Sequence, residues 1–325
     1  MDDQNLKELE REQADNKLIN DAFQHLIDTY VASRHRKKVD IVTKAFNFAR
    51  QAHKGVRRLS GEPYIMHPIA VADWLVNTNR SQEMLENRLV FWAKHFPCPM
   101  GGYGGGFRTW LFSPGRLYDF KGNVYEDGKR HPYNSYGNGS AMRASACGWA
   151  AKSIEEALDL GKRSAEITHN HPEGIKGAQA TAAAIFMARQ GETKEAIRSY
   201  IEQTFGYDLK HTCDEIRPYY DWESSCQGTV PPAFLAFFDS HDFEESIRLA
   251  VSLGGDSDTL ACITGGIAQA YYKEIPDEII EQMQMRLPKE FWEVMEKLAD
   301  DYSFLPSWFG DFTGCAVRFS PTAVP

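Results

Sequence analysis

Apolar residues recur every three or four positions along most of the chain, which is the spacing of amphipathic α-helices. Residues 1–34 and 39–53 show this pattern, and a further helix is predicted from Pro68 to about Val76, because proline suits a first helical turn. Residues 81–96 also look helical. From Gly137 onward one predicted helix follows another. These helices cover residues 140–151, 153–168, 174–190, 192–204, 231–238, 243–253, 257–272, 277–285 and 288–302.

The stretch between these two groups of helices has a different composition. Residues 100–107 contain five glycines, too many for a helix interior, and an irregular segment rich in Pro, Asp and Tyr follows to about Tyr136. Runs rich in Val, Ile and Thr with a period of two are absent from the sequence. We therefore predict an all-α fold, a compact multi-helix bundle.

Two of the predicted helices are unusually rich in small residues, at 177–184 and 259–268. Gly265 and Gly266 cost about 1 kcal/mol each relative to alanine inside a helix, and close approach of a neighbouring helix would offset that cost. These two helices are therefore predicted to be central. Entry signals mark two others: Ser153 with Glu156 forms a capping box, and Asp242 can cap a helix that starts at Phe243.

Composition excludes several classes of protein. The 325 residues carry 45 acidic and 36 basic side chains, a net charge of -9, which disfavours a protein that coats nucleic acid. Mean hydropathy is -0.46, and no apolar stretch reaches the roughly 18 residues that span a membrane. Residues 1–5 are polar and acidic, unlike a signal peptide. We expect a cytoplasmic protein with neither nucleic-acid nor membrane partners.

The six cysteines are far apart and form no Cys-x-x-Cys motif. We interpret them as reduced, mostly buried thiols rather than disulfides or zinc ligands. They are Cys98, Cys147, Cys213, Cys226, Cys262 and Cys315.

The segment with the clearest chemistry is Gly-Gly-Asp-Ser-Asp-Thr at 254–259, at the predicted start of a helix. Asp256, Asp258 and Thr259 place two carboxylates and a hydroxyl within four residues, and hard cations such as Mg²⁺ or Mn²⁺ prefer oxygen ligands of this kind. The alternative is an ordinary helix N-cap, because aspartate is common at helix starts and needs no metal there.

Two further segments combine glycine or histidine with a predicted helix start. Residues 136–143 form a glycine-rich turn whose free N–H groups suit a phosphate, or else only a turn and a cap. Residues 168–174 contain His169 and His171. Zinc is disfavoured there because no third ligand has a local spacing, which leaves a ligand-contacting loop or a helix end followed by a proline-started helix.

These segments resemble the ADP-ribosylglycohydrolase family over residues 87–299. Four strings occur in the family's order and at similar spacings: Gly-Asn-Gly-Ser-Ala-Met-Arg (137–143), Thr-His-Asn-His-Pro-Glu-Gly (168–174), Ser-Cys-Gln-Gly-Thr-Val-Pro (225–231) and Gly-Gly-Asp-Ser-Asp-Thr (254–259). The resemblance implies an all-α bundle of that type and up to two Mg²⁺ or Mn²⁺ ions. It also implies hydrolysis of the C1″ bond of an ADP-ribosylated protein side chain or an ADP-ribosyl small molecule.

The resemblance also implies roles for individual residues. By this likeness Asp256, Asp258 and Thr259 are metal ligands. The diphosphate and ribose would lie against four residues of the second segment, and His169 would lie near the nucleotide. Those four residues are Asn138, Gly139, Ser140 and Met142.

Part of the family pattern is missing from the sequence. The family draws other ligands from an N-terminal Thr-Asp-Asp string and acid–base help from an early Gly-Asp and Glu segment. The adjacent aspartates here are Asp2-Asp3 and Asp300-Asp301, none after a threonine, and no Gly-Asp pair precedes residue 87. The catalytic acid or base is therefore left unassigned.

A second resemblance covers residues 20–78. The segment 52–68 is similar to the start of the hydrolase (HD) domain of the stringent-response (p)ppGpp hydrolase/synthetase family. That likeness implies a Mn²⁺ ligand in His67 and nucleotide contacts from Arg58 and Ser60. The His-Asp pair needed to complete such a site occurs at His241-Asp242, which we interpret as a helix cap.

The sequence thus predicts three parts. Residues 1–80 are a helical fragment resembling the start of a truncated HD domain. Residues 81–302 form a glycohydrolase-like domain without its usual N-terminal part, and residues 303–325 are a tail. The predicted function is metal-dependent removal of ADP-ribose, impaired by the missing Thr-Asp-Asp ligands. The alternatives are a catalytically silent ADP-ribose-binding module and a remnant (p)ppGpp hydrolase.

Overall fold

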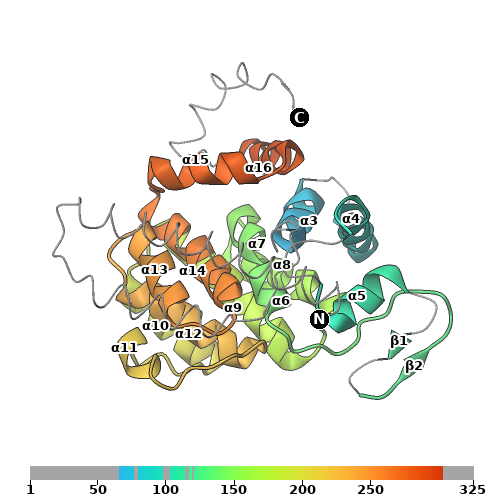
Figure 1. The fold of residues 1–325 in the computed structure, drawn as a ribbon, viewed down its shortest axis with the longest axis horizontal. Coiled ribbons are helices and arrows are strands. Elements are labelled where there is room, and N and C mark those ends of the chain that lie inside the picture. Colours follow the sequence, from blue (N-terminus) through green and yellow to red (C-terminus); the bar gives the residue numbers. More distant parts are fainter. Residues whose placement is uncertain (1–65, 77–79, 98–102, 114–116, 119–120, 303–325) are drawn as a thin grey trace, which may run out of the picture. The chain divides into compact units, whose positions relative to one another are not determined.

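The computed structural model describes residues 66–76, 80–97, 103–113, 117–118 and 121–302. The chain divides into two compact units, residues 1–59 and 60–325. The first unit, with the helices predicted at 1–34 and 39–53, lies outside the described residues. In the second unit the regular secondary structure of the described chain is helical apart from one short hairpin (Figure 1). The all-α prediction is confirmed for this unit.

Fourteen helices lie in the described part of the chain. In chain order they are α3 (Met66–Leu75), α4 (Gln82–His95), α5 (Gly105–Phe112), α6 (Gly139–Met142), α7 (Ser145–Ala150), α8 (Ile154–Glu166), α9 (Pro172–Gln190), α10 (Lys194–Phe205), α11 (Cys213–Ile216), α12 (Cys226–Asp239), α13 (Phe243–Ser252), α14 (Ser257–Tyr272), α15 (Asp277–Arg286) and α16 (Lys289–Asp301). The hairpin pairs β1 (Leu117–Tyr118) with β2 (Val124–Tyr125) in antiparallel register.

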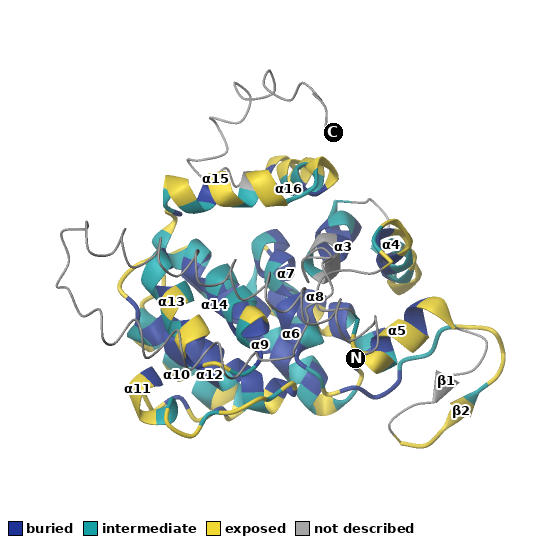
Figure 2. Ribbon diagram, viewed as in Figure 1, coloured by how far each residue is buried: buried dark blue, intermediate teal, exposed yellow. Residues whose placement is uncertain are grey.

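The two small-residue helices, α9 and α14, pack at the centre of the bundle, as predicted. Helix α9 contacts α6, α7, α8, α10, α12 and α14, and its surface is largely buried (Figure 2). Its glycines permit close approach: a methyl group on Gly177 would lie 2.5 Å from the Cys226 sulfur of α12. On α14, a methyl group at Gly266 would lie 3.2 Å from Cβ of Ser145. The proximity of neighbouring helices explains why glycine occupies these helix interiors.

The helix α5 contradicts the predicted glycine-rich irregular segment. It begins at Gly105, inside the range 100–107 that was expected to be irregular. Its side chains Phe107, Trp110 and Leu111 are buried in the cluster that also holds Trp74 of α3. Apolar burial therefore outweighs the low helix propensity of glycine in this first turn.

The start of α12 was also predicted too late. The helix begins at Cys226 and continues through Pro231 and Pro232. A proline at position 232 leaves the carbonyl of Gly228 without its usual helical donor. The Tyr220 hydroxyl donates to that carbonyl at 3.4 Å, which supplies a replacement hydrogen bond.

Helix entry signals are confirmed at two positions. The Asp242 side chain accepts from Glu245 N at 2.7 Å and caps α13. The Ser153 hydroxyl accepts from Glu156 N at 3.2 Å at the start of α8. The return bond of the predicted capping box differs, because the Glu156 carboxylate accepts from Lys152 N rather than from the cap residue itself.

Helix α3 belongs to the second unit. Its side chains Trp74 and Leu75 are buried, and the Tyr302 hydroxyl after α16 donates to the Leu75 carbonyl at 2.9 Å. Helix α3 lies before residue 80 and packs with α4, α7 and α16, which follow it. The predicted division of the chain at residue 80 remains a prediction.

Two expectations from composition concern the described residues. Of the cysteines, Cys147, Cys213 and Cys226 are buried, Cys262 is half-buried, and all four are free thiols, as predicted. Within the described ranges, no helix combines the length and the apolar character that crossing a membrane requires.

Candidate functional site

The four sequence strings meet in one hydrogen-bonded cluster, which we call the convergence site. It consists of residues 136–143, 168–174, 223–231 and 254–259. Backbone bonds join two of these segments: Asn138 N donates to Ser224 O at 2.8 Å, and Cys226 N donates to Tyr136 O at 2.8 Å. Segments that lie almost ninety residues apart in the chain are therefore fixed against each other at the N-termini of α6 and α12.

The side chain of Asn138 connects three of the strings. Its buried amide nitrogen donates to Asp256 Oδ2 at 2.7 Å and to Thr229 Oγ1 at 3.0 Å. Both hydrogens of the amide are thus used inside the protein. Thr229, on α12, was not singled out from the sequence, although it lies within the string 225–231.

Ser140 joins the remaining string, residues 168–174, to the same cluster. Its hydroxyl donates to Gly174 O at 2.7 Å and lies 3.3 Å from the Cys226 sulfur. Because the hydroxyl is fully buried and uses its hydrogen internally, Ser140 holds the segments together. Gly139, beside it, starts α6, and a methyl group there would lie 3.5 Å from the His169 ring.

Met142 at the end of α6 contacts the start of α14. The Thr259 hydroxyl lies 3.8 Å from the Met142 sulfur, and the Cys262 thiol donates to the Met142 carbonyl at 3.4 Å. Met142 and Thr259 are both buried. By resemblance, Met142 was predicted to contact the ligand and Thr259 to bind a metal. The structure brings these two side chains into contact.

The glycine pair before Asp256 is required by the backbone. Gly254 and Gly255 have φ values of 78° and 60°, a left-handed conformation that L side chains rarely adopt. A methyl group on Gly255 would also lie 2.9 Å from the carbonyl oxygen of Asp221. The tight turn that follows directs the Asp256 side chain into the cluster.

Asp256 occupies the N-cap position of α14, yet its side chain forms no capping hydrogen bond. The carboxylate instead accepts from Asn138, 118 positions earlier in the chain. The ordinary N-cap interpretation therefore fails for Asp256. Asp258, in the first turn of α14, is exposed, and its Oδ1 accepts from Thr259 N at 2.9 Å.

The charges of the Asp256 and Asp258 carboxylates decide whether this turn suits a metal ion. Burial, and after it the proximity of Asp258, raises the pKa of Asp256 to about 6. Two adjacent carboxylates, one of them desolvated, match the donor chemistry of an oxygen-coordinated divalent ion that keeps several waters. The described residues contain no cluster of three or more His, Cys, Asp or Glu side chains placed to hold an ion. The assignment of Asp256, Asp258 and Thr259 as ligands of Mg²⁺ or Mn²⁺ therefore remains a prediction.

His169 is held by a chain of buried hydrogen bonds. Arg143 Nη2 donates to Thr168 Oγ1 at 2.6 Å, and Thr168 Oγ1 lies 2.7 Å from His169 Nδ1. The alternative acceptor for the Thr168 hydroxyl, Ala165 O, is 3.5 Å away and already accepts from three N–H groups, of Thr168, His169 and Arg143. We infer from this crowding that the hydroxyl donates to His169 Nδ1, which would place the ring hydrogen on Nε2.

Arg143 is a charged side chain that lies entirely inside the protein. Its guanidinium is completely buried, and its Nε and Nη1 atoms lack hydrogen-bond partners among the described residues. Burial lowers the pKa of Arg143 to about 10, still well above neutrality. Neither Arg143 nor Thr168 was given a role from the sequence.

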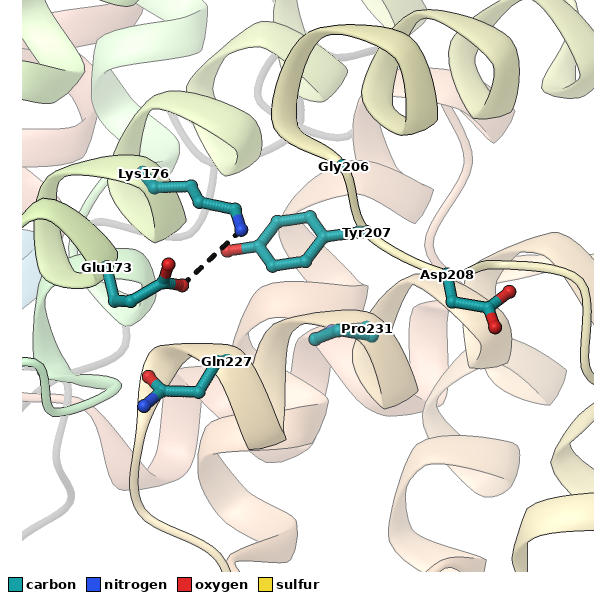
Figure 3. Close-up of a pocket in the computed structure, with 7 residues that line it drawn as sticks. All are labelled: Glu173, Lys176, Gly206, Tyr207, Asp208, Gln227 and Pro231. Atoms are coloured by element: carbon teal, nitrogen blue, oxygen red, sulfur yellow. Dashed lines mark ion pairs between the residues drawn. The ribbon is translucent and has the colours of Figure 1, made fainter.

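A cavity of about 530 Å³ lies beside two of the strings, between the N-terminal turns of α9 and α12 (Figure 3). None of the residues predicted to bind the ligand or the metal lines it. Its lining consists of Glu173, Lys176, Gly206, Tyr207, Asp208, Gln227 and Pro231.

The residues of the second resemblance are mostly outside the described structure. Arg58 and Ser60 lie there, and His67 lies on α3 with a side chain that is not described. His241 and Asp242 are described: Asp242 caps α13, and His241 Nδ1 lies 2.9 Å from the Glu245 carboxylate on the surface. The interpretation of this pair as a helix cap is confirmed.

Comparison with known proteins identifies a matching family and similar proteins. Residues 19–309 match the family model for ADP-ribosylglycohydrolase. The mouse ADP-ribosylhydrolase ARH3 is 29% identical over 232 residues, which cover 55% of this chain and 61% of that protein. The chain thus spans less than two thirds of the length of this relative.

Two further similarities concern the fold and a short segment. A solved structure described as an ADP-ribosylglycohydrolase-related protein complex superimposes with a TM-score of 0.53 at 24% identity, over 73% of this chain and 79% of that one, and shows the fold. The bifunctional (p)ppGpp synthase/hydrolase SpoT of Escherichia coli is 40% identical over 70 residues, 22% of this chain and 10% of that protein. On the extent of the family match, the chain belongs to the ADP-ribosylglycohydrolase family.

Proposed function

We propose that the protein is a metal-dependent hydrolase that removes ADP-ribose from a modified protein side chain or a small ADP-ribosyl conjugate. Family membership supports the reaction class. The observation that carries the proposal to this site is the 2.7 Å hydrogen bond from Asn138 to Asp256, which unites the glycine-rich bend with the aspartate turn. A cytoplasmic location is part of the proposal.

Cleavage at C1″ develops positive charge on the ribose and needs an activated water. Asp256, Asp258 and Thr259 would hold Mg²⁺ or Mn²⁺, which when bound polarises hydroxyl groups and lowers the pKa of a coordinated water. Asn138 holds the Asp256 carboxylate in place through its hydrogen bond to Oδ2. Gly139 would border the diphosphate and ribose, the fully buried Ser140 would hold this bend in place, and Met142 packs against Thr259.

The proposed nucleotide contact of His169 follows from its hydrogen bonds. Thr168 and Arg143 fix the ring so that Nε2 carries the hydrogen, and a methyl group on Gly137 would lie 3.5 Å from this atom. An Nε2–H group donates to a phosphate or ribose oxygen without requiring a charged imidazole.

Incubation with an ADP-ribosyl-arginine peptide and Mg²⁺ or Mn²⁺ tests the proposal. We expect released ADP-ribose, and we expect its loss in Asp256→Asn and Asp258→Asn. The surface variant Asp214→Asn is a matched control, because Asp214 is an exposed side chain paired with Arg217. Absence of release at high enzyme concentration would reject catalysis.

The same preparation distinguishes two other functions. A catalytically silent ADP-ribose-binding module would bind ADP-ribose in calorimetry without turnover and without a need for metal. The short likeness to SpoT supports a third candidate, remnant (p)ppGpp hydrolysis through His67. Release of pyrophosphate from ppGpp, lost in His67→Ala and retained in Asp256→Asn, would support that candidate.

A further inference from the structure

Thr229 is a fully buried residue whose hydroxyl lies between two groups of the convergence site. The hydroxyl donates to the Glu223 carbonyl oxygen at 3.2 Å and accepts from the side-chain nitrogen of Asn138 at 3.0 Å. Because a carbonyl oxygen can only accept, the single hydrogen of the hydroxyl is used there. The Asn138 atom that faces Thr229 must therefore be a donor, which is the Nδ2 nitrogen.

Asp256 fixes the same amide from another direction. Its Oδ2 atom accepts from Asn138 Nδ2 at 2.7 Å, and a carboxylate oxygen offers no hydrogen in return. A reversed amide would place its oxygen against this carboxylate and against the lone pairs of Thr229, and both hydrogen bonds would be lost. Two independent neighbours thus specify one orientation of the Asn138 side chain.

This orientation leaves the Asn138 side-chain oxygen as the atom that a ligand can use. Both hydrogens of the amide are bonded within the protein, and Oδ1 accepts no hydrogen bond from a described residue. Asn138 is 8% exposed, and its Oδ1 does not belong to the buried atoms that lack a partner in the described part of the chain. Oδ1 is therefore an unused acceptor that remains accessible.

An acceptor at this position discriminates between the parts of an ADP-ribosyl ligand. Phosphate oxygens are acceptors too and carry negative charge, so Oδ1 would repel them. The ribose hydroxyls and the adenine amino group can donate. A ribose hydroxyl suits the position best, because the amide is bonded directly to Asp256 in the turn proposed to hold the metal at the bond that is cleaved.

We infer that Thr229 is a positioning residue that sets the specificity of the site: it fixes Asn138 so that Oδ1 accepts a hydrogen bond from a hydroxyl of the ribose cleaved at C1″. The inference rests on the proposed function. It narrows the role that the family resemblance gave to Asn138, which included both the diphosphate and the ribose. Thr229 does not touch the ligand, because it is fully buried, and it acts through the amide.

Calorimetric titration of the full-length protein with ADP-ribose and with ADP, both in the presence of Mg²⁺, tests the inference. ADP keeps the adenine and the diphosphate but lacks the second ribose, so the ratio of the two dissociation constants isolates the predicted contact. Thr229→Val keeps the shape of the side chain and removes its hydroxyl. We expect its dissociation constant for ADP-ribose to rise about fivefold, the loss of one hydrogen bond, and that for ADP to change by less than about twofold.

Two further variants separate positioning from a structural role. Thr229→Ser retains the hydroxyl and should preserve the wild-type ratio. Thr264→Val is the matched control, since Thr264 is also fully buried and its hydroxyl donates to a backbone carbonyl, Ala233 O at 2.8 Å, without a bond to Asn138. It should preserve the ratio as well. A general loss of packing would weaken binding of both ligands and leave the ratio unchanged.

NMR of the side-chain amides of the wild type gives a second measurement, which does not depend on the folding of Thr229→Val. With the Asn138 signals assigned by Asn138→Ala, both amide hydrogens should exchange slowly with water, with and without ADP-ribose. A rapidly exchanging Asn138 hydrogen, or equal losses of ADP-ribose and ADP affinity in Thr229→Val, would overturn the inference. Absence of ADP-ribose binding by the wild type would instead reject the proposed function, and with it the ligand assigned to Asn138.

Discussion

Asn138 donates a hydrogen bond of 2.7 Å to the buried carboxylate of Asp256, across 118 positions of sequence. A second bond from the same amide, 3.0 Å long, reaches Thr229 on α12. One side chain therefore joins the glycine-rich bend, the aspartate turn and a third helix, and we expect its removal to affect both stability and ligand binding.

Replacing Asn138 with alanine should destabilise the folded protein by about 1–3 kcal/mol, because the Asp256 carboxylate stays buried without its donor. Urea denaturation of the metal-free protein measures this change. The exposed Asn87 on α4 provides a control, and Asn87→Ala should alter stability by less than about 0.5 kcal/mol. Equal stabilities for the two variants would contradict the role given to this amide.

The contact between α7 and α9 depends on a glycine. A methyl group on Gly148 would lie 2.6 Å from the Ala182 carbonyl oxygen and 2.7 Å from the Ile185 side chain. Gly148→Ala should lower stability by about 1–3 kcal/mol through overpacking. Gly105→Ala in the first turn of α5 meets nothing within 4 Å, so thermal melting should show it unchanged or slightly stabilised. Similar losses in both variants would refute close helix approach as the cause.

The buried thiols predict a fall in stability at alkaline pH. Burial raises the pKa of Cys147 to about 12 and of Cys226 to about 11, from an ordinary value of 9.0. Between pH 9 and these values the unfolded chain has lost protons that the folded protein retains. Unfolding then releases protons, and the free energy of unfolding decreases as the pH rises.

Chemical denaturation at a series of pH values from 8 to 10 checks this slope. Cys147→Ala should give a shallower decrease than the wild type, whatever its stability at pH 8. Other groups that titrate in this range are common to both proteins, so the difference isolates the thiol. Identical slopes would show that Cys147 ionises normally in the folded state.

The Arg143–Thr168–His169 chain predicts which ring nitrogen of His169 carries the hydrogen. Nitrogen-15 NMR of the histidine rings, assigned with His169→Gln, should show the Nε2–H form in the wild type and in Thr168→Ser. Thr168→Val removes the hydroxyl, so the ring should lose this preference, and stability should fall by about 1–3 kcal/mol as Arg143 loses the nearer of its two acceptors. An Nδ1–H ring in the wild type would contradict the assigned direction of the hydrogen bond.

Helical periodicity and caps predict much of the described fold from sequence. The helices α13 and α14 match the predicted ranges 243–253 and 257–272 to within a residue, because strong patterns and end signals agree there. The prediction is wrong for helices whose start or existence depends on contacts with distant parts of the chain. The first turns of α12 precede two prolines, and Tyr220 replaces a hydrogen bond that Pro232 cannot donate, while α5 buries Trp110.

In the candidate site, too, some features are visible in the sequence and others appear only in the folded chain. The strings that contain Asn138 and Asp256 are visible in the sequence, but the bond between them requires the folded chain. The contact between Thr229 and Asn138 has no sequence signal, since the two residues lie 91 positions apart in the chain. Arg143 likewise resembles any surface arginine until its burial is known.

Calorimetric titration of the protein with ADP-ribose, in the presence of Mg²⁺, tests the central claim most directly. If the bend at Asn138 and the turn at Asp256 form one ligand site, the wild type binds ADP-ribose saturably and Asn138→Ala and Asp256→Asn each weaken binding. The double variant should then lose little more than either single variant, because both changes break the same connection. Absence of binding by the wild type, or wild-type affinity in both single variants, would contradict the account.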